Sequence, residues 1–145
     1  MKRTTVLAYL AATLISMGSA CAYAQSPAFK VPFDFTVGSQ VFPAGSYQVS
    51  YYPTKTAILI RSRDDDRFHA FATTYPADYP ADPSTRDDEV VFTKYGNQYF
   101  LHEVLCSDLS MNVALPMSRL EKRTRVQEAQ LPHGEAVATL RIGEK

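Results

Sequence analysis

The residues that most resemble a reactive pair are His102 and Cys106, which lie four positions apart in a strand-like stretch. This even spacing places both side chains on one face of a strand, as a Cys–His nucleophile requires. At about 3.3 Å per residue the two Cα atoms lie roughly 13 Å apart, too far for a direct hydrogen bond. We therefore interpret Cys106 as a packed thiol and His102 as an ordinary strand residue.

Two other clusters have the residue types of metal ligands without the required spacing. His102-Glu103 resembles the start of a zinc-binding H-E-x-x-H helix, but Cys106 stands in the place of the second histidine and the context is a strand. Asp64-Asp65-Asp66 offers oxygen ligands for Ca²⁺ but lacks the spaced order of a calcium loop, and arginines flank it. We expect a salt-bridged turn, with no metal, no cofactor and no catalytic residue.

Strands must position these side chains, because apolar residues alternate with polar ones along most of the chain. Turn signals at Gly38-Ser39, Pro43-Ala44-Gly45, Asp64–Asp66 and Gly96-Asn97 separate the strands. This pattern predicts an all-β domain, a small antiparallel β-barrel or β-sandwich of about seven to eight strands. One strand is expected to place five large apolar side chains on a single face: Phe29, Val31, Phe33, Phe35 and Val37.

The clearest predicted hairpin joins residues 89–95 to residues 98–106. Both faces of the second strand are mostly apolar, which favours a central strand covered on both sides. Strict alternation would then turn either His102 or Glu103 inward, where a charged side chain needs a partner. We expect a buried polar contact here, with a ligand-binding group as the alternative.

One short helix is predicted, beginning at the capping box Ser118-x-x-Glu121 and ending near Gln130. Its basic side chains suggest docking on anionic lipid or polysaccharide. Glu121 and Glu128 interrupt this patch, so a solvated surface is expected instead. The basic residues concerned are Arg119, Lys122, Arg123 and Arg125.

Residues 1–24 have the pattern of a signal peptide, with a basic start, an apolar run and the cleavage motif Ala22-Tyr23-Ala24. Residues 25–145 would then form a single exported domain, periplasmic or extracellular, with no transmembrane span after cleavage. The alternative is a lipoprotein anchored through Cys21, although the leucine usual three places earlier is replaced by Gly18.

The charge balance indicates which partners are not expected, and the cysteine content indicates what stabilises the fold. Fifteen basic residues balance fifteen acidic ones, so nucleic acid is not an expected partner. After cleavage Cys106 is the remaining cysteine, which excludes an internal disulfide and leaves stability to the core.

Four phrases together resemble a family of small exported bacterial β-proteins without an established activity. Its recurrent patterns read PFDF-x-V-G, P-A-G-x-Y, Y-G-x-x-Y-F-L and L-P-x-S-x-x-E. They match this chain at residues 31–47, 90–104 and 115–122, behind the signal peptide. The resemblance implies export and a β fold, and it implies no chemistry.

The expected function is that of a non-catalytic exported β-module with a binding or structural role in the cell envelope or outside the cell. One alternative is a barrel that holds a small apolar ligand among its aromatic side chains. A hydrolase, in which Glu103, His102 or Asp34 meet in a cleft, and an outer-membrane β-barrel are the others. The residues expected to contact a ligand are His102, Glu103, Tyr47 and Tyr99.

Overall fold

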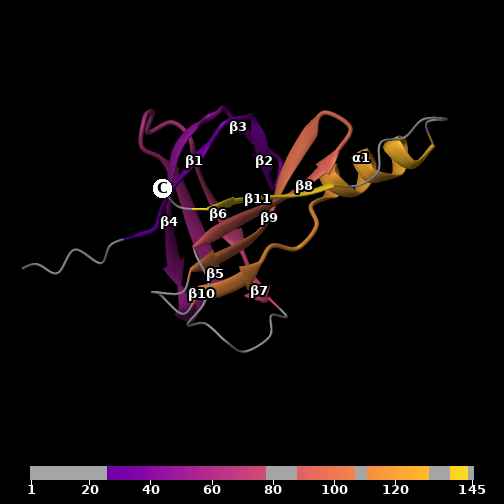
Figure 1. The fold of residues 1–145 in the computed structure, drawn as a ribbon. Helices are drawn as coiled ribbons and strands as arrows, with labels where there is room; N and C mark the ends of the chain where they lie inside the picture. Colours follow the sequence, from indigo (N-terminus) through magenta and orange to yellow (C-terminus); the bar gives the residue numbers. More distant parts are fainter. Residues whose placement is uncertain (1–25, 78–87, 107–110, 131–137, 144–145) are drawn as a thin grey trace, which may run out of the picture.

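The computed structural model describes residues 26–77, 88–106, 111–130 and 138–143, which form two β-sheets and one α-helix (Figure 1). The predicted signal peptide and Cys21 lie outside these residues. The four-stranded sheet has the order β1 (Ala28–Val31), β4 (Gly45–Tyr52), β5 (Ala57–Ser62) and β6 (His69–Thr73). The seven-stranded sheet has the path β11 (Ala138–Gly143), β8 (Glu89–Tyr95), β9 (Gln98–Cys106), β10 (Met111–Ala114) and β7 (Tyr75–Pro76).

Two further strands, β2 (Phe35–Val37) and β3 (Gln40–Phe42), form a hairpin that joins the larger sheet through β9. A short 3-10 helix (Pro53–Lys55) follows β4, and α1 (Arg119–Ala129) follows β10. One of the two sheets is curled into a half-barrel. The prediction of an all-β barrel or sandwich with one short helix is therefore confirmed.

The first predicted strand is divided between the two sheets. Phe29 and Val31 lie in β1, whereas Phe35 and Val37 lie in β2, and the chain crosses between the sheets at residues 32–34. Pro32 lacks an N–H, so pairing stops where a ladder would need a donor. Phe33 at the crossing is only partly buried. β1 lies at an edge of its sheet, as expected for a strand that runs into a proline.

The hairpin predictions are confirmed to the residue. β2 and β3 turn at Gly38-Ser39, and Gly38 adopts the left-handed φ of 65° that this tight turn requires. β8 and β9 have the predicted bounds, with Tyr95 opposite Gln98 across Gly96-Asn97.

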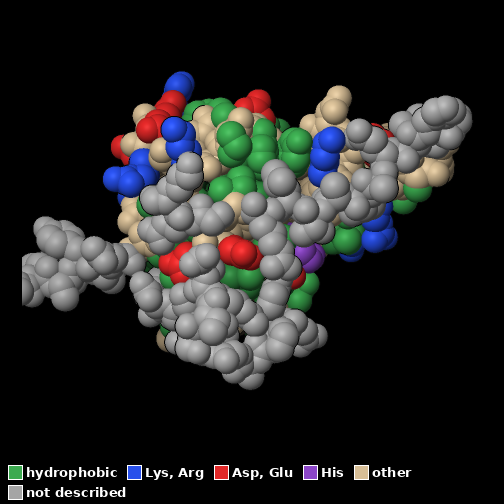
Figure 2. Space-filling view, viewed as in Figure 1, with side chains coloured by type: hydrophobic (Ala, Val, Ile, Leu, Met, Phe, Trp, Pro, Cys, Tyr) green, Lys and Arg blue, Asp and Glu red, His purple; other side chains and the backbone are tan. Residues whose placement is uncertain are grey.

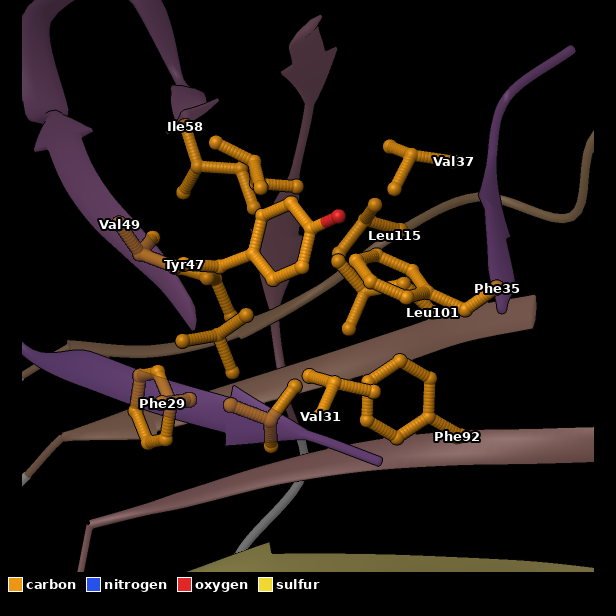
Figure 3. Packing of buried hydrophobic residues seen from close by; sticks show 14 of the residues in the cluster. Phe29, Val31, Phe35, Val37, Tyr47, Val49, Ile58, Phe92, Leu101 and Leu115 are labelled. Carbon is orange, nitrogen blue, oxygen red and sulfur yellow. The ribbon is translucent and has the colours of Figure 1, made fainter. Parts of the chain in front are cut away.

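The space between the sheets is filled with aliphatic and aromatic side chains. Phe42, Phe92 and Ile58 are fully buried, and Tyr47 reaches from β4 into the same cluster (Figure 3). A void of about 10 Å³ lies among these described core residues, with walls formed by apolar side chains and Tyr47. A void of this size holds at most about one water molecule, so the described side chains pack closely around it.

Two carboxylates fix the corner between β3 and β4. Asp34 accepts the backbone N–H of Ala44 at 2.8 Å, and Asp64 accepts that of Ser46 at 2.9 Å. The Tyr47 hydroxyl donates to the carbonyl oxygen of Pro43, four residues earlier. A Cβ at Gly45 would lie 3.0 Å from Oδ2 of Asp64, so glycine leaves room for that carboxylate. The Pro-Ala-Gly-x-Tyr phrase is therefore a hydrogen-bonded corner.

This corner predicts an alkaline pH dependence. Burial, followed by the negative charges of Asp64 and Asp34, raises the pKa of Tyr47 from 10.0 to about 12. The contribution of Tyr47 to the free energy of unfolding is then fully present below pH 10 and is lost as pH rises from 10 to about 12. Denaturant unfolding of wild type and Tyr47→Phe across this range measures it. The stability difference, about 0.5–1.5 kcal/mol at neutral pH, should shrink as pH rises; a constant difference would contradict the assignment.

The three consecutive aspartates form the turn between β5 and β6, as predicted. The Arg67 guanidinium donates to both carboxylate oxygens of Asp65, with Nη2 2.6 Å from Oδ2. These hydrogen bonds lower the pKa of Asp65. Asp64 accepts the Ser46 N–H at the β3–β4 corner. Two neighbouring aspartates of this turn therefore have different roles, one in an ion pair and one in a backbone hydrogen bond.

Candidate functional site

A β-bulge at His102 reverses the face that β9 turns toward the core. Across to β8, the pairing passes from Leu101–Phe92 directly to Glu103–Val91, which leaves His102 without a partner on that strand. Leu101 therefore faces the core before the bulge, and Val104 faces it afterwards. Neither His102 nor Glu103 has to enter the apolar interior, which resolves the conflict predicted from strict alternation.

The bulge places His102 and Glu103 together at the edge of the core. Nε2 of His102 lies 3.4 Å from Oε1 of Glu103, and the two side chains are 35% and 17% exposed. β9 is paired on both sides, by β8 and β10, as expected for a central strand. Its face opposite the core also buries apolar side chains, among them Phe100 and Leu105.

The helix α1 adds a second carboxylate to this region. Ser118 is the N-cap and its hydroxyl accepts the N–H of Glu121 at 3.0 Å, while the Glu121 carboxylate accepts the backbone N–H of Ser118. The predicted capping box is therefore present. The same carboxylate accepts a hydrogen bond from the Tyr95 hydroxyl, and both residues are about 95% buried.

The electrostatics of Glu121 follow from this burial. Burial removes water from the Glu121 carboxyl group, and this effect raises its pKa. Four neighbours partly oppose the rise: the Ser118 N–H, the charge of His102, the Tyr95 hydroxyl and the charge of Arg125. Burial and the neighbouring Glu121 likewise raise the pKa of Tyr95. We call these five residues the polar junction: Tyr95, His102, Glu103, Glu121 and Arg125.

The raised pKa of Glu121 predicts a stability that falls with increasing pH. The folded state binds the proton more tightly than the unfolded state, so this contribution is fully present below pH 4.5 and is lost as pH rises through the raised pKa. Glu121→Gln keeps the capping box and removes the titration. The stability of wild type minus that of Glu121→Gln, from denaturant unfolding at a series of pH values, should decrease above pH 4.5. An increase would mean that the carboxylate is favoured by its site.

The residues predicted to contact a ligand separate into different environments. His102 and Glu103 come together in the polar junction. Tyr47 belongs to the β3–β4 corner, and Tyr99 stacks on Phe33 with ring centroids 4.0 Å apart. Cys106 is buried and its thiol donates to Asp88 at 3.2 Å, consistent with a packed thiol. Asp34, the third acid suggested for a hydrolase, accepts the Ala44 N–H instead.

The sequence alone gave no indication of Tyr95 and Arg125 as members of the polar junction. Tyr95 and Glu121 are 26 positions apart, and only the packing of α1 on β8 brings them together. The capping box identified Glu121 as a helix residue but not as a partner for the sheet. The available signal was Glu121 itself, an acid three residues after the N-cap Ser118, where a helix that packs on a sheet can bury a side chain.

The polar junction links the sheet to the helix, because the Tyr95 hydroxyl on β8 donates to the Glu121 carboxylate on α1. The charge of His102 acts on Glu121 of the helix, whereas Glu103 contacts His102 within β9. One void between the sheets is lined by other side chains. Within residues 26–77, 88–106, 111–130 and 138–143, no three His, Cys, Asp or Glu side chains gather to hold a metal ion. Comparisons with protein-family models, with curated proteins and with solved structures find no match for this chain.

Proposed function

We propose that this protein is an exported, non-catalytic β-module that binds its partner in the cell envelope or outside the cell through its outer surface. The observation that carries the proposal is the filled interior. Small-molecule sites usually have volumes of about 300–1,000 Å³, whereas the void described among the core residues of the two sheets is about 10 Å³. A binding function therefore belongs to the exterior, which disfavours the alternative of a ligand-holding barrel.

The placement of the titratable groups supports a role without catalysis. Asp34, Asp64 and Glu121 each accept backbone hydrogen bonds, and Asp65 pairs with Arg67. A general acid or base needs carboxylate oxygens that face a substrate. The oxygens of these carboxylates instead accept hydrogen bonds in turns and at the helix cap. The signal-like residues 1–24 support export, and within the described residues no helix has the length and hydropathy to cross a membrane.

Cell fractionation together with native mass spectrometry tests this proposal. The protein, purified from its own host, is expected in the periplasm or medium with Gln25 as its first residue and with the mass of the bare chain. A cytoplasmic location would overturn the exported role. A stoichiometric small molecule retained in the native spectrum would overturn the filled interior and restore the ligand-binding barrel.

A further inference from the structure

One face of α1 carries three cations and an exposed aliphatic side chain. Arg119, Lys122, Arg123 and Val126 occur at the spacing i, i+3, i+4, i+7, which aligns them on one side of a helix. All four are exposed, Val126 by 53%. We call these four residues the basic stripe. Figure 2 shows Lys and Arg side chains at the α1 end of the molecule.

The two acids of the helix do not interrupt the stripe, contrary to the sequence prediction. Glu121 is buried against Tyr95, and the Glu128 carboxylate lies over Gly96, whose added Cβ would sit 2.5 Å from Oε1. Both acids therefore point toward the sheet, on the side of α1 opposite to the stripe. Among the described residues, the three stripe cations form no ion pair.

The stability of the fold does not account for this placement. Neighbouring like charges at i, i+3 and i, i+4 repel one another and weaken a helix. All three cations also lie in its N-terminal half, where the helix dipole disfavours positive charge, and the last turn carries no basic residue. The stripe therefore costs the free protein stability, and a negatively charged partner would remove that cost.

The exposed aliphatic side chains distinguish between kinds of anionic partner. Val126 lies within the stripe, and Leu120, 38% exposed, lies beside it. A soluble polyanion gains from the cations alone, whereas a lipid surface also gains from apolar side chains that enter the boundary between headgroups and acyl chains. The helix is accessible to a flat surface, because it extends away from the sheets at one end of the molecule (Figure 1).

We propose that the basic stripe docks the protein reversibly on a membrane surface rich in anionic lipid headgroups, an inference that rests on the proposed exterior binding function. Each cation near such a surface contributes about 1 kcal/mol, so three give a weak, salt-sensitive attachment. The small apolar area keeps this attachment shallow, and Val126 adds to it only where it meets lipid.

Co-sedimentation of the mature chain with vesicles tests the proposal. The vesicles contain either phosphatidylglycerol mixed with phosphatidylethanolamine, or phosphatidylcholine alone. Binding is expected to the anionic vesicles only, and the triple variant Arg119→Gln, Lys122→Gln, Arg123→Gln should lower the partition coefficient on the order of 100-fold. Far-UV circular dichroism checks that the variant folds. Equal binding by wild type and triple variant would overturn the proposal.

A matched control removes the same charge elsewhere. The variant Lys30→Gln, Arg61→Gln, Arg63→Gln changes three exposed cations, two in the smaller sheet and one in the turn after β5, and should retain binding within a few-fold. An equal loss in both variants would mean that net charge, and not the stripe, drives binding. Because truncating three side chains could affect folding, the single variant Val126→Ser provides a second test.

Val126→Ser separates lipid from a soluble polyanion. It should weaken vesicle binding about three- to ten-fold through lost apolar burial, and leave binding to heparin, used as a polyanion probe, unchanged. Vesicle binding that is unaffected by Val126→Ser would overturn lipid docking in favour of a polyanionic partner. If the protein is exported but does not bind the vesicles, only this inference is overturned. If the protein is cytoplasmic, the proposed function itself is overturned.

Discussion

Replacing Phe92 with alanine should lower the free energy of unfolding by about 3–5 kcal/mol, the usual cost of deleting a buried ring. Phe92 is fully buried on β8, with ring centroids 5.3 Å from Phe33 and 5.2 Å from Phe35. Its side chain also borders the small void between the sheets, so truncation would enlarge that void into a cavity. In a domain of ordinary stability, about 5–15 kcal/mol, this removes a large share of the total.

Chemical denaturation followed by circular dichroism measures this loss. Phe71→Ala is the control, because Phe71 lies on β6 with 59% of its surface exposed and its ring contacts Tyr52. It should cost no more than about 1 kcal/mol. A cost for Phe92→Ala no larger than that of Phe71→Ala would mean that the interior is not closely packed, and the argument for exterior binding would lose its basis.

The second large effect is expected at the polar junction. Tyr95→Phe keeps the ring but removes the hydroxyl that donates to the buried Glu121 carboxylate. A buried acceptor left without one of its donors costs about 1–3 kcal/mol, with the larger values for charged groups. The same substitution at Tyr75, which is 47% exposed, is the control and should be nearly neutral.

A double-mutant cycle with Glu121→Gln identifies the charge as the source of this cost. In the glutamine background the Tyr95 hydroxyl meets a neutral acceptor, so Tyr95→Phe should cost only about 0.5–1.5 kcal/mol. If the cost is the same in both backgrounds at neutral pH, the carboxylate is not the partner that makes Tyr95 important.

The hairpins could be predicted closely because their determinants are local. Gly96-Asn97 between two alternating runs determines both the turn and the pairing of β8 with β9, and Gly38-Ser39 does the same for β2 and β3. The capping box likewise marked the start of α1 within one residue. In each case the interacting residues are close neighbours in the sequence.

The division of the first strand could not be predicted from alternation. Phe33 and Phe35 continue the same period as Phe29 and Val31, yet the chain leaves one sheet and joins the other between them. Both sheets contribute to one core, so the apolar alternation continues through residues 32–34. The sequence pattern therefore does not show where the chain changes sheets. Only Pro32 marks the position of the crossing, because it has no N–H to donate to a strand partner.

The bulge at His102 was hidden for a related reason. A single inserted residue exchanges the two faces of a strand, and both faces of β9 are apolar enough to tolerate either register. The polar junction depends on this insertion and on the docking of α1, which are tertiary features. The candidate residues His102 and Glu103 were therefore recognised as unusual in sequence, but their neighbours Tyr95 and Glu121 were not.

The buried side of α1 consists of Glu121 and Thr124, so hydrogen bonds rather than apolar area attach the helix to the sheet. Thr124 adds only a 3.4 Å contact to Gln98, and Leu120 and Val126 point outward. The helix should therefore open as a separate cooperative unit, with its amide protons exchanging well before those of β8 and β9. The exposed positions of α1 can therefore vary in sequence without disturbing the packing between the two sheets.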